Sequence, residues 1–502
     1  MTALSDFRRS LDGSDLPDRL RRGLIGEGLR FETPFGAREL LYADYTASGR
    51  SLRQVEDFVL ERILPFYANS HTEASFCGMT MTRMREEARA MIARLVHADE
   101  NCHVLFTGSG ATAGLNRIVH LLELPRRVAA GESVVVLTGP YEHHSNILPW
   151  RESGARVVAV PEVLGGGPDL SRLAEELDAA RDADLVVGSF SAASNVTGIL
   201  TDPDPVTRLL KSRGALAVWD YAGGAPYLPM DMTPAAGCAK DAIVFSPHKF
   251  PGGPGASGVT VVRDTIVRSD TPTCPGGGTV DFVSPWRHVY STRVEAREEG
   301  GTPNVIGDIR AALAMLVKDA VGLECIVERD KELRRRGLAR LRKCDRIELL
   351  GTDTENALPI FSFRVRNNTG GFIHHQLFSR MLSDIHGIQV RGGCACAGPY
   401  AHTLLCLNQQ QSEDLLRRLS EGEELEKPGW VRLNLSYLLS DEQADRILDA
   451  VTRLASQADR WAACYRGEAR TARFTASVDR ASSPEARRPP AEHAQRLQRT
   501  LP

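Results

Sequence analysis

Short apolar runs alternate with helix-like stretches between residues 100 and 265, and this alternation constrains the fold more than any other feature of the chain. Most of the runs are continuous and are soon followed by Gly, Ser, Thr or Asp. This spacing is typical of βαβ units, in which parallel strands are buried on both faces. We therefore expect a largely parallel α/β sheet whose ligands sit beyond the carboxyl ends of its strands. The expected strands are Val104–Phe106, Val134–Leu137, Val157–Val160, Leu185–Val187, Leu216–Trp219 and Ala242–Phe245.

The composition changes after about residue 305, where a long helical stretch from Ile309 to Arg342 precedes a second strand-containing region. This change predicts a large domain over residues 38–305 and a smaller α+β domain over 306–467, with residues 1–37 as an N-terminal extension. The tail 468–502 is rich in Arg, Ala, Ser and Pro and has few large apolar residues, so we expect it to be disordered.

Charge and cysteine content exclude several classes of function. The 502 residues include 61 basic and 64 acidic side chains, a net charge of −3, which favours neither nucleic acid nor a membrane surface as partner. The N-terminus lacks the apolar core of a signal peptide, and no later run approaches the roughly 18 apolar residues that span a bilayer, so a cytoplasmic location is expected. The ten cysteines are too dilute for a disulfide scaffold and lack zinc spacing, so no metal site is expected.

Lys249 follows the last expected strand and opens a turn rich in glycine and proline. Burial lowers the pKa of a lysine and supplies the neutral amine that forms a Schiff base with the aldehyde of pyridoxal 5'-phosphate (PLP). A lysine at a strand end is more often an ordinary surface residue, so this assignment depends on the other strand ends.

The other strand ends carry groups that suit the same ligand. The turn Thr107–Asn116 is rich in glycine and opens a helix, so its backbone amides and the Thr112 hydroxyl can bind a phosphate. The segment Tyr141–Asn146 offers an imidazole for stacking on a heteroaromatic ring, and Asn195 offers an amide. Asp220 ends a buried strand, where its carboxylate can keep a pyridine nitrogen protonated, although it could equally cap the next helix.

Together these residues resemble the class V aminotransferase-fold PLP enzymes, specifically their cysteine desulfurase and selenocysteine lyase branch. The resemblance extends over roughly residues 38–465 and includes Tyr42–Ser48 and Glu298–Asn304, which are similar to two conserved segments of that family. It implies PLP-dependent transferase fold type I, with a large domain built on a mainly parallel sheet and a smaller α+β C-terminal domain.

The resemblance also implies roles for individual residues. Lys249 would hold PLP as a Schiff base and act as general acid and base, and Asp220 would bind the pyridine nitrogen. His143 would stack on the ring and assist proton transfer, with His144 as the alternative, while Ala222 would pack on the opposite face. Asn195 would contact the ring oxygen and the substrate. The phosphate would be held by Ala111, Thr112, Ser246 and His248, together with Thr279 from the neighbouring subunit of a homodimer.

The second domain supplies a thiol and two arginines in the same resemblance. Cys396 follows Arg391 by five residues, as the sulfur-accepting cysteine of desulfurases does, and a nearby guanidinium would favour its thiolate. Arg432 resembles the arginine that grips the substrate carboxylate. Cys394 is open to three interpretations: a resolving thiol, a sulfur relay or a small apolar filler.

The expected reaction is the conversion of L-cysteine to L-alanine with transfer of sulfur to Cys396 as a persulfide, with selenocysteine as a chemically close substrate and a sulfur-acceptor protein as a partner. Two departures keep other branches open. Gly223 stands where desulfurases commonly have glutamine, and residues 397–431 form a longer segment than in many relatives, suited to a lid or a partner surface. The alternatives are C–S β-lyase, epimerase or transaminase activity. A PLP-binding scaffold without turnover is disfavoured, because Lys249, Asp220 and Arg432 are all retained.

Overall fold

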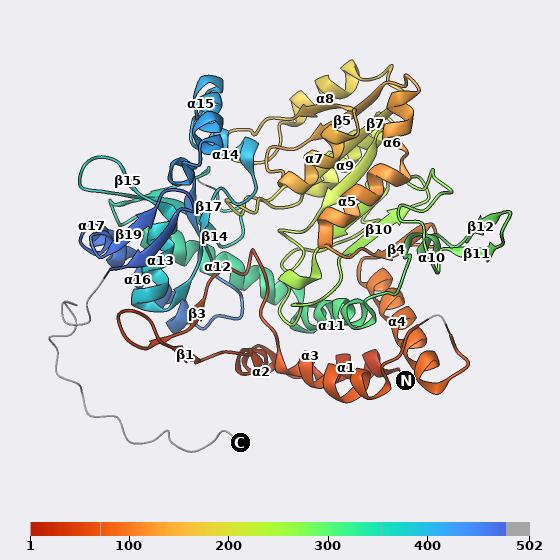
Figure 1. Ribbon diagram of the computed structural model, residues 1–502, viewed down its shortest axis with the longest axis horizontal. Coiled ribbons are helices and arrows are strands. Elements are labelled where there is room, and N and C mark those ends of the chain that lie inside the picture. The colour runs from red at the N-terminus through yellow and green to blue at the C-terminus, as the bar shows by residue number, and fades with distance from the viewer. Residues whose placement is uncertain (1, 71, 353, 478–502) are drawn as a thin grey trace.

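A seven-stranded sheet forms the centre of the larger lobe in the computed structural model, which describes residues 2–70, 72–352 and 354–477 (Figure 1). Strand β10 is antiparallel to both of its neighbours, and the other neighbouring strands are parallel. All six expected strands lie in this sheet, which confirms the predicted α/β architecture; β10 was not predicted. The order across the sheet is β4 (Cys102–Phe106), β10 (Val259–Arg263), β9 (Ala242–Phe245), β8 (Leu216–Asp220), β7 (Leu185–Ser191), β5 (Val134–Thr138) and β6 (Arg156–Ala159).

Both faces of this sheet are covered by helices. Val135 and Leu137 of β5 pack into one apolar cluster, whereas Val134 and Val136 pack into another on the opposite face. One layer contains α5 (Gly110–Leu121), α6 (Leu124–Ala129) and α7 (Leu148–Glu152). The other contains α4 (Phe76–Leu95), α8 (Leu170–Ala179), α9 (Pro203–Ser212) and α11 (Val305–Val321). Burial on both faces explains why the strands read as continuous apolar runs.

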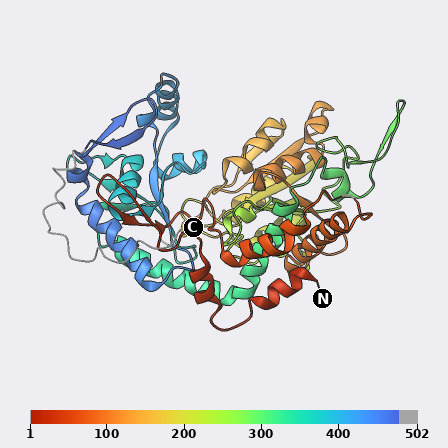
Figure 2. The same ribbon diagram turned by 60° about the horizontal axis from the view of Figure 1, so that its bottom comes forward.

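The smaller lobe is built on an antiparallel sheet with its own apolar core (Figures 1 and 2). The strands are β13 (Ile347–Leu349), β14 (Ile360–Arg366), β18 (Trp430–Asn434) and β17 (Arg391–Gly393) in that order, with β15 (Phe372–Ile373) beside β14. The helices are α12 (Leu323–Leu341), α13 (His375–His386), α14 (Gly398–Leu404), α15 (Gln409–Ser420), α16 (Asp441–Ser456) and α17 (Ala458–Ala462), with the 3-10 turn η5 (Glu424–Glu426).

The chain passes from one lobe to the other at Gly322. This glycine has φ +85°, a backbone conformation that L side chains rarely adopt, and it divides the long helical stretch expected over 309–342 into α11 and α12. Helix α11 packs in the core of the larger lobe, while Leu333 and Leu338 of α12 pack in that of the smaller lobe. The change of core therefore comes one helix later than the boundary expected after residue 305.

The N-terminal residues belong to the body of the larger lobe. Leu4 and Phe7 of α1 (Ala3–Ser10) and Leu20 of α2 (Leu16–Gly23) are buried in its core, so the expected extension 1–37 contributes to packing. The following elements are the hairpin of β1 (Arg30–Phe31) and β2 (Arg38–Glu39), β3 (Leu41–Tyr42), α3 (Arg53–Phe58), η1 (Val59–Ile63) and η2 (Leu64–Phe66). Strand β3 pairs with β16 (Ile388–Gln389) and so ties the N-terminal region to the smaller lobe.

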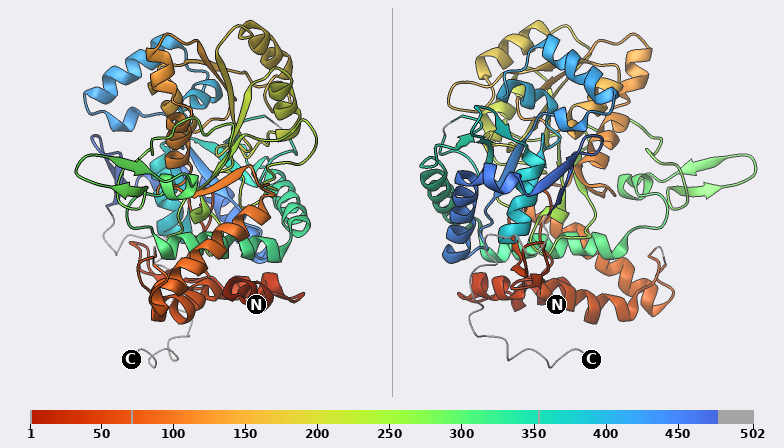
Figure 3. Two further views of the ribbon diagram at one scale, coloured as in Figure 1. Left: turned by 90° about the vertical axis from the view of Figure 1, so that its right-hand side faces the viewer. Right: turned by 60° about the vertical axis from the view of Figure 1, so that its left-hand side comes forward.

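Two peripheral hairpins complete the fold. One joins β11 (Val280–Val283) and β12 (His288–Tyr290), precedes α10 (Val294–Glu298) and projects away from the body (Figure 3). The other pairs β19 (Tyr465–Glu468) with β20 (Arg473–Ala476), so ordered structure continues past residue 468, where a disordered tail was expected. The rest of that tail, 478–502, lies outside the described residues. No helix in the described part of the chain has the length and apolarity needed to cross a membrane.

Candidate active site

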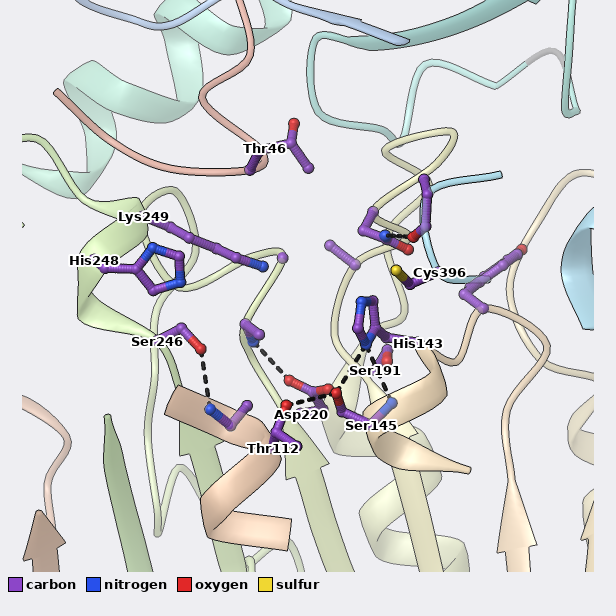
Figure 4. A pocket seen from close by; sticks show the side chains of 18 of the residues that line it. Thr46, Thr112, His143, Ser145, Ser191, Asp220, Ser246, His248, Lys249 and Cys396 are labelled. Atoms are coloured by element: carbon purple, nitrogen blue, oxygen red, sulfur yellow. Dashed lines mark hydrogen bonds between the residues drawn. The ribbon is translucent and has the colours of Figure 1, made fainter. Parts of the chain in front are cut away.

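A pocket of about 220 Å³ lies where β5, β7, β8 and β9 end, between the two lobes. Its position agrees with the rule that ligands of parallel sheets bind beyond the carboxyl ends of the strands. Figure 4 shows Lys249 and Cys396 on opposite sides of the pocket, with Asp220 below them. Every predicted site residue except Thr279 lines it: Ala111, Thr112, His143, Asn195, Asp220, Ala222, Ser246, His248, Lys249, Arg391, Cys396 and Arg432.

Lys249 ends the 3-10 turn η4 (Pro247–Lys249), which follows β9 after a single residue. Removal from solvent lowers the pKa of its amine to about 8; Asp220 opposes this shift, and Arg432 and Arg391 add to it. Because an ordinary lysine titrates near pH 10.4, a far larger share of this amine is neutral at pH 7 than for a surface lysine. The pocket thus holds a nucleophilic amine.

Asp220 is the last residue of β8 and is only 3% exposed. Burial raises the pKa of this carboxyl, while the Ala222 N–H, which donates to Oδ1 over 2.7 Å, and the Lys249 cation act in the opposite direction. A buried carboxylate with so few partners can accept a proton or pair with a cationic ring nitrogen. The adjoining turn places the Ala222 side chain at the same wall of the pocket.

Hydroxyl groups gather where α5 begins. The Ala111 N–H donates to Ser246 Oγ over 3.0 Å, and Thr112 Oγ1 lies 2.7 Å from Ser145 Oγ. Gly110 has φ +66°, and a Cβ there would lie 2.5 Å from Ser246 Oγ, so only glycine permits this approach. Amides at a helix N-terminus together with several hydroxyls form a donor set suited to a phosphate group.

The two adjacent histidines of the loop after β5 point to different places. His143 lines the pocket, and the Ser145 N–H donates to its Nδ1 over 3.1 Å. Burial, reinforced by Lys249, lowers the pKa of His143 to about 4, so the ring is neutral at pH 7. His144 does not line the pocket; its Nε2 accepts a hydrogen bond from the Gly398 N–H over 2.8 Å.

Two arginines that line the pocket, from neighbouring strands, share one carboxylate. Arg391 and Arg432 are opposite each other in the β17–β18 ladder. Arg432 Nη2 donates to Asp44 Oδ1 over 3.0 Å, and Arg391 Nε donates to Asp44 Oδ2 over 3.1 Å. Arg432 is 4% exposed, and its Nε has no hydrogen-bond partner among the described residues. The pair can therefore bind an anionic group that enters the pocket.

Cys396 lies in a tight turn between β17 and α14, with Ala395 and Cys396 both left-handed at φ +54° and +53°. Its side chain is exposed and lines the pocket, whereas Cys394 is half-buried against an apolar cluster that contains Trp430. This packing is what the filler interpretation of Cys394 expects. Asn195 Nδ2 donates to Ala395 O over 2.8 Å, so part of the amide expected to contact a ring oxygen is engaged by the turn.

Two polar side chains at or near the pocket were not singled out from the sequence. Thr46 lines the pocket, and its buried hydroxyl has no partner within the described ranges. Glu142 accepts hydrogen bonds from the Ser191 N–H and hydroxyl, and burial raises the pKa of its carboxyl to about 7. Thr46 lies within Tyr42–Ser48 and Glu142 within Tyr141–Asn146, so the motifs themselves were the available signal, although Glu142 does not line the pocket.

Thr279 lies outside the pocket of its own chain. It is buried at the base of the β11–β12 hairpin, where its hydroxyl donates to Gly276 O over 2.7 Å. A contact with the site of a second subunit stays a prediction.

Comparison with known proteins gives one family and a consistent set of relatives. The family model "Aminotransferase class-V" matches residues 41–417. A cysteine desulfurase from Enterobacter sp. (strain 638) is 29% identical over 382 residues, covering 74% of this chain and 89% of the relative. A probable cysteine desulfurase from Pyrococcus abyssi is 28% identical, covering 75% and 89%. The apo structure of a cysteine desulfurase from Thermococcus onnurineus NA1 superposes with TM-score 0.70 at 23% identity, covering 88% of this chain and 98% of that one.

Proposed function

This chain belongs to the aminotransferase class-V family, and we propose that it is a PLP-dependent cysteine desulfurase that converts L-cysteine to L-alanine and carries the released sulfur on Cys396. The observation that carries the proposal is the meeting of a nucleophilic amine, an exposed thiol and two arginines in one pocket. The names of the relatives, at 28–29% identity over about three quarters of the chain, support the same activity.

The residues fit the cofactor that the family implies. Lys249 would hold it covalently, Asp220 would keep its ring nitrogen protonated, and the rings of His143 and PLP would stack, with Ala222 on the other face. Asn195 would contact the ring oxygen through one proton of its Nδ2 amide, the other of which donates to Ala395 O. The phosphate would be held by Ala111, Thr112, Ser246 and His248, and by Thr279 of a second copy of the chain. When bound, PLP supplies an aldehyde that links to amines and a ring that withdraws electrons from the linked amino acid.

Different side chains would then bind the substrate, transfer its protons and accept its sulfur. Arg432 and Arg391 bind and orient the carboxylate of cysteine. The Lys249 amine takes the proton from Cα; after the C–S bond breaks, one proton is delivered to Cβ and one is returned to Cα, the second of them coming from the substrate thiol. The Cys396 thiolate attacks the substrate sulfur: an S–S bond forms, the Cβ–S bond breaks, and its electron pair stays with the carbon fragment that becomes alanine. Sulfur leaves as the Cys396 persulfide, so atoms and electrons balance without another reactant.

An exposed hairpin supports a homodimer with shared sites. The β11–β12 hairpin stands clear of the body and exposes Trp286 by 89% and Val283 by 63%, with Thr279 at its base. Exposed apolar side chains on a projecting hairpin are typical of a protein interface. Light scattering at micromolar concentration should give about twice the mass of one chain. A sulfur-acceptor protein and a cytoplasmic location remain predictions.

The test is anaerobic incubation of the PLP-loaded protein with L-cysteine, quantifying alanine, sulfide and pyruvate. We expect alanine from the wild type, at least about a hundredfold less from Cys396→Ala, and none from Lys249→Ala. Pyruvate formation that is indifferent to Cys396→Ala would identify a C–S β-lyase instead, the alternative that Gly223 in the pocket wall keeps open.

A further inference from the structure

His144 makes two hydrogen bonds to the segment that carries Cys396. Its backbone N–H donates to Cys396 O over 2.8 Å, and its ring Nε2 accepts from the Gly398 N–H over 2.8 Å. We call residues 394–398 the Cys396 loop. The loop belongs to the smaller lobe and His144 to the larger one, so both bonds cross the junction between the lobes.

The Cys396 loop needs such external contacts to keep its shape. Ala395 and Cys396 are consecutive residues with φ +54° and +53°, which is unfavourable for side chains with a Cβ and persists only where surrounding contacts enforce it. Within the loop itself, the Ala397 N–H donates to Cys394 O over 3.2 Å. From the larger lobe, Asn195 holds Ala395 O, and His144 holds both Cys396 and Gly398.

The ring of His144 can accept a hydrogen bond from Gly398 only while it is neutral. A neutral imidazole that accepts at Nε2 carries its proton on Nδ1, and a protonated imidazole donates at both nitrogens and accepts at neither. Protonation of His144 would therefore place its Nε2–H against the Gly398 N–H, and the hydrogen bond between the two groups would be lost.

We propose that His144 is a positioning residue, whose neutral ring holds the Cys396 loop at the pocket and whose protonation releases it. Its significance for the reaction rests on the proposed role of Cys396, but the contact itself does not depend on that role. His143 and His144 thus have separate tasks: one faces the pocket and the other fixes the segment that carries the thiol.

The surroundings of His144 keep the ring neutral at ordinary pH. Burial lowers the pKa of His144, and the cations Arg151 of α7 and Lys427, just after η5, lower it further. The neighbouring imidazole of His143 lies 6.1 Å away between ring centroids, and the thiols of Cys394 and Cys396 stand in the loop that His144 holds. Helix α5 and strand β7 also pack on the 3-10 turn η3 (His144–Asn146), and among the described residues neither contributes a charged group to this pKa shift. The contact is therefore expected to persist at pH 7 and to weaken in acid.

Hydrogen exchange measures the hydrogen bond between Gly398 and His144 directly, because the Gly398 amide is its donor. The PLP-loaded wild type, His144→Leu and His144→Gln would be compared between pH 5 and 8 without substrate, with rates corrected for intrinsic exchange. In the wild type, protection of the Gly398 amide should fall about three- to tenfold as the pH is lowered through the titration of the His144 ring, the effect of losing one hydrogen bond. In His144→Leu it should be low at every pH. In His144→Gln, whose side-chain oxygen can accept in place of Nε2 but does not titrate, it should stay high at every pH.

The control is His120→Leu, the same substitution in the last turn of α5, which should preserve the wild-type profile. Wild-type protection in His144→Leu, or a pH profile in His144→Gln equal to that of the wild type, would overturn the proposal. If His144→Leu fails to fold, comparison of the wild-type and His144→Gln pH profiles still tests the proposal. Because no turnover is measured, failure here is separate from failure of the desulfurase proposal.

Discussion

Arg432, which lines the pocket, forms an ion pair with Asp44, with Nη2 and Oδ1 3.0 Å apart and the arginine 4% exposed. Asp44 also binds Arg391, so one carboxylate orients both arginines that face the pocket. A substrate carboxylate would meet a pair of guanidinium groups that are already held in place.

Replacing Asp44 by asparagine should destabilise the protein, because the buried Arg432 loses its counter-charge. We expect a loss of about 3 kcal/mol in the free energy of unfolding, the usual cost of breaking a buried ion pair. Because an incoming carboxylate would replace the missing charge, L-alanine should raise the melting temperature of Asp44→Asn more than that of the wild type. Thermal unfolding with and without L-alanine measures both effects.

The control is Asp178→Asn, which removes an exposed pair with Arg213 and should cost under about 0.5 kcal/mol. Equal stabilisation by L-alanine in Asp44→Asn and wild type would contradict this assignment.

Cys394 should be dispensable for chemistry, because it packs against an apolar cluster while Cys396 lines the pocket. Cys394→Ser should retain alanine formation within about threefold of the wild type and should lose a few tenths to about 1 kcal/mol of stability through the buried hydroxyl. Alanine assays and mass spectrometry of the persulfide-bearing peptide test this. A loss as large as that of Cys396→Ala would instead make Cys394 a relay or resolving thiol.

The lowered pKa of Lys249 predicts the pH dependence of cofactor uptake. The amine gains its nucleophilic form as pH rises through about 8, so the rate of PLP incorporation into the apo-protein should be half-maximal near that pH and level off at higher pH. Rapid-mixing absorbance between pH 6 and 10 measures this, with N-acetyl-lysine as the solvent-exposed reference amine. A half-maximal rate near pH 10 would mean that the pocket does not perturb the amine. Lys249→Arg should show no covalent incorporation at any pH.

Glu299 should be among the most sensitive positions for stability. It is buried between Arg85 and Arg89, accepts from Arg89 Nη1 over 2.7 Å and also accepts from the Phe106 N–H over 2.8 Å. Glu299→Gln should cost about 3–5 kcal/mol near pH 7.

The pH dependence of that cost follows from the ion pairs. Burial opposes ionisation of Glu299, but the two arginines hold the pKa of its carboxyl below its usual value. Its stabilisation is therefore complete above the unfolded pKa and is lost as pH falls through the lower folded pKa. Denaturant unfolding at pH 7 and pH 4 should show a smaller gap between Glu299→Gln and wild type in acid. Glu421→Gln, which breaks an exposed pair with Arg417, is the matched control and should change stability little. A gap that widens in acid would argue against this account.

The residues at the strand ends could be predicted from the sequence, whereas the ion pairs of Asp44 could not. Asp220 ends β8, Lys249 follows β9 within a few residues, and Thr112 and His143 follow β4 and β5. Parallel strands end at the same edge, so a chain that forms this sheet must bring these groups together. Asp44 is different: 347 and 388 residues separate it from its two arginine partners, and no local pattern encodes that contact.

The same division applies to the fold. The amino-acid sequence by itself determined the strands and their polar ends, because burial on both faces demands continuous apolar runs. It also indicated the family through its short motifs. The antiparallel direction of β10, the break at Gly322, the bridging by Asp44 and the contact between His144 and Gly398 were decided only by tertiary structure. These features depend on how the two lobes pack and on which groups, distant in the sequence, then come into contact. The free energy of such contacts cannot be inferred from any local stretch of the chain.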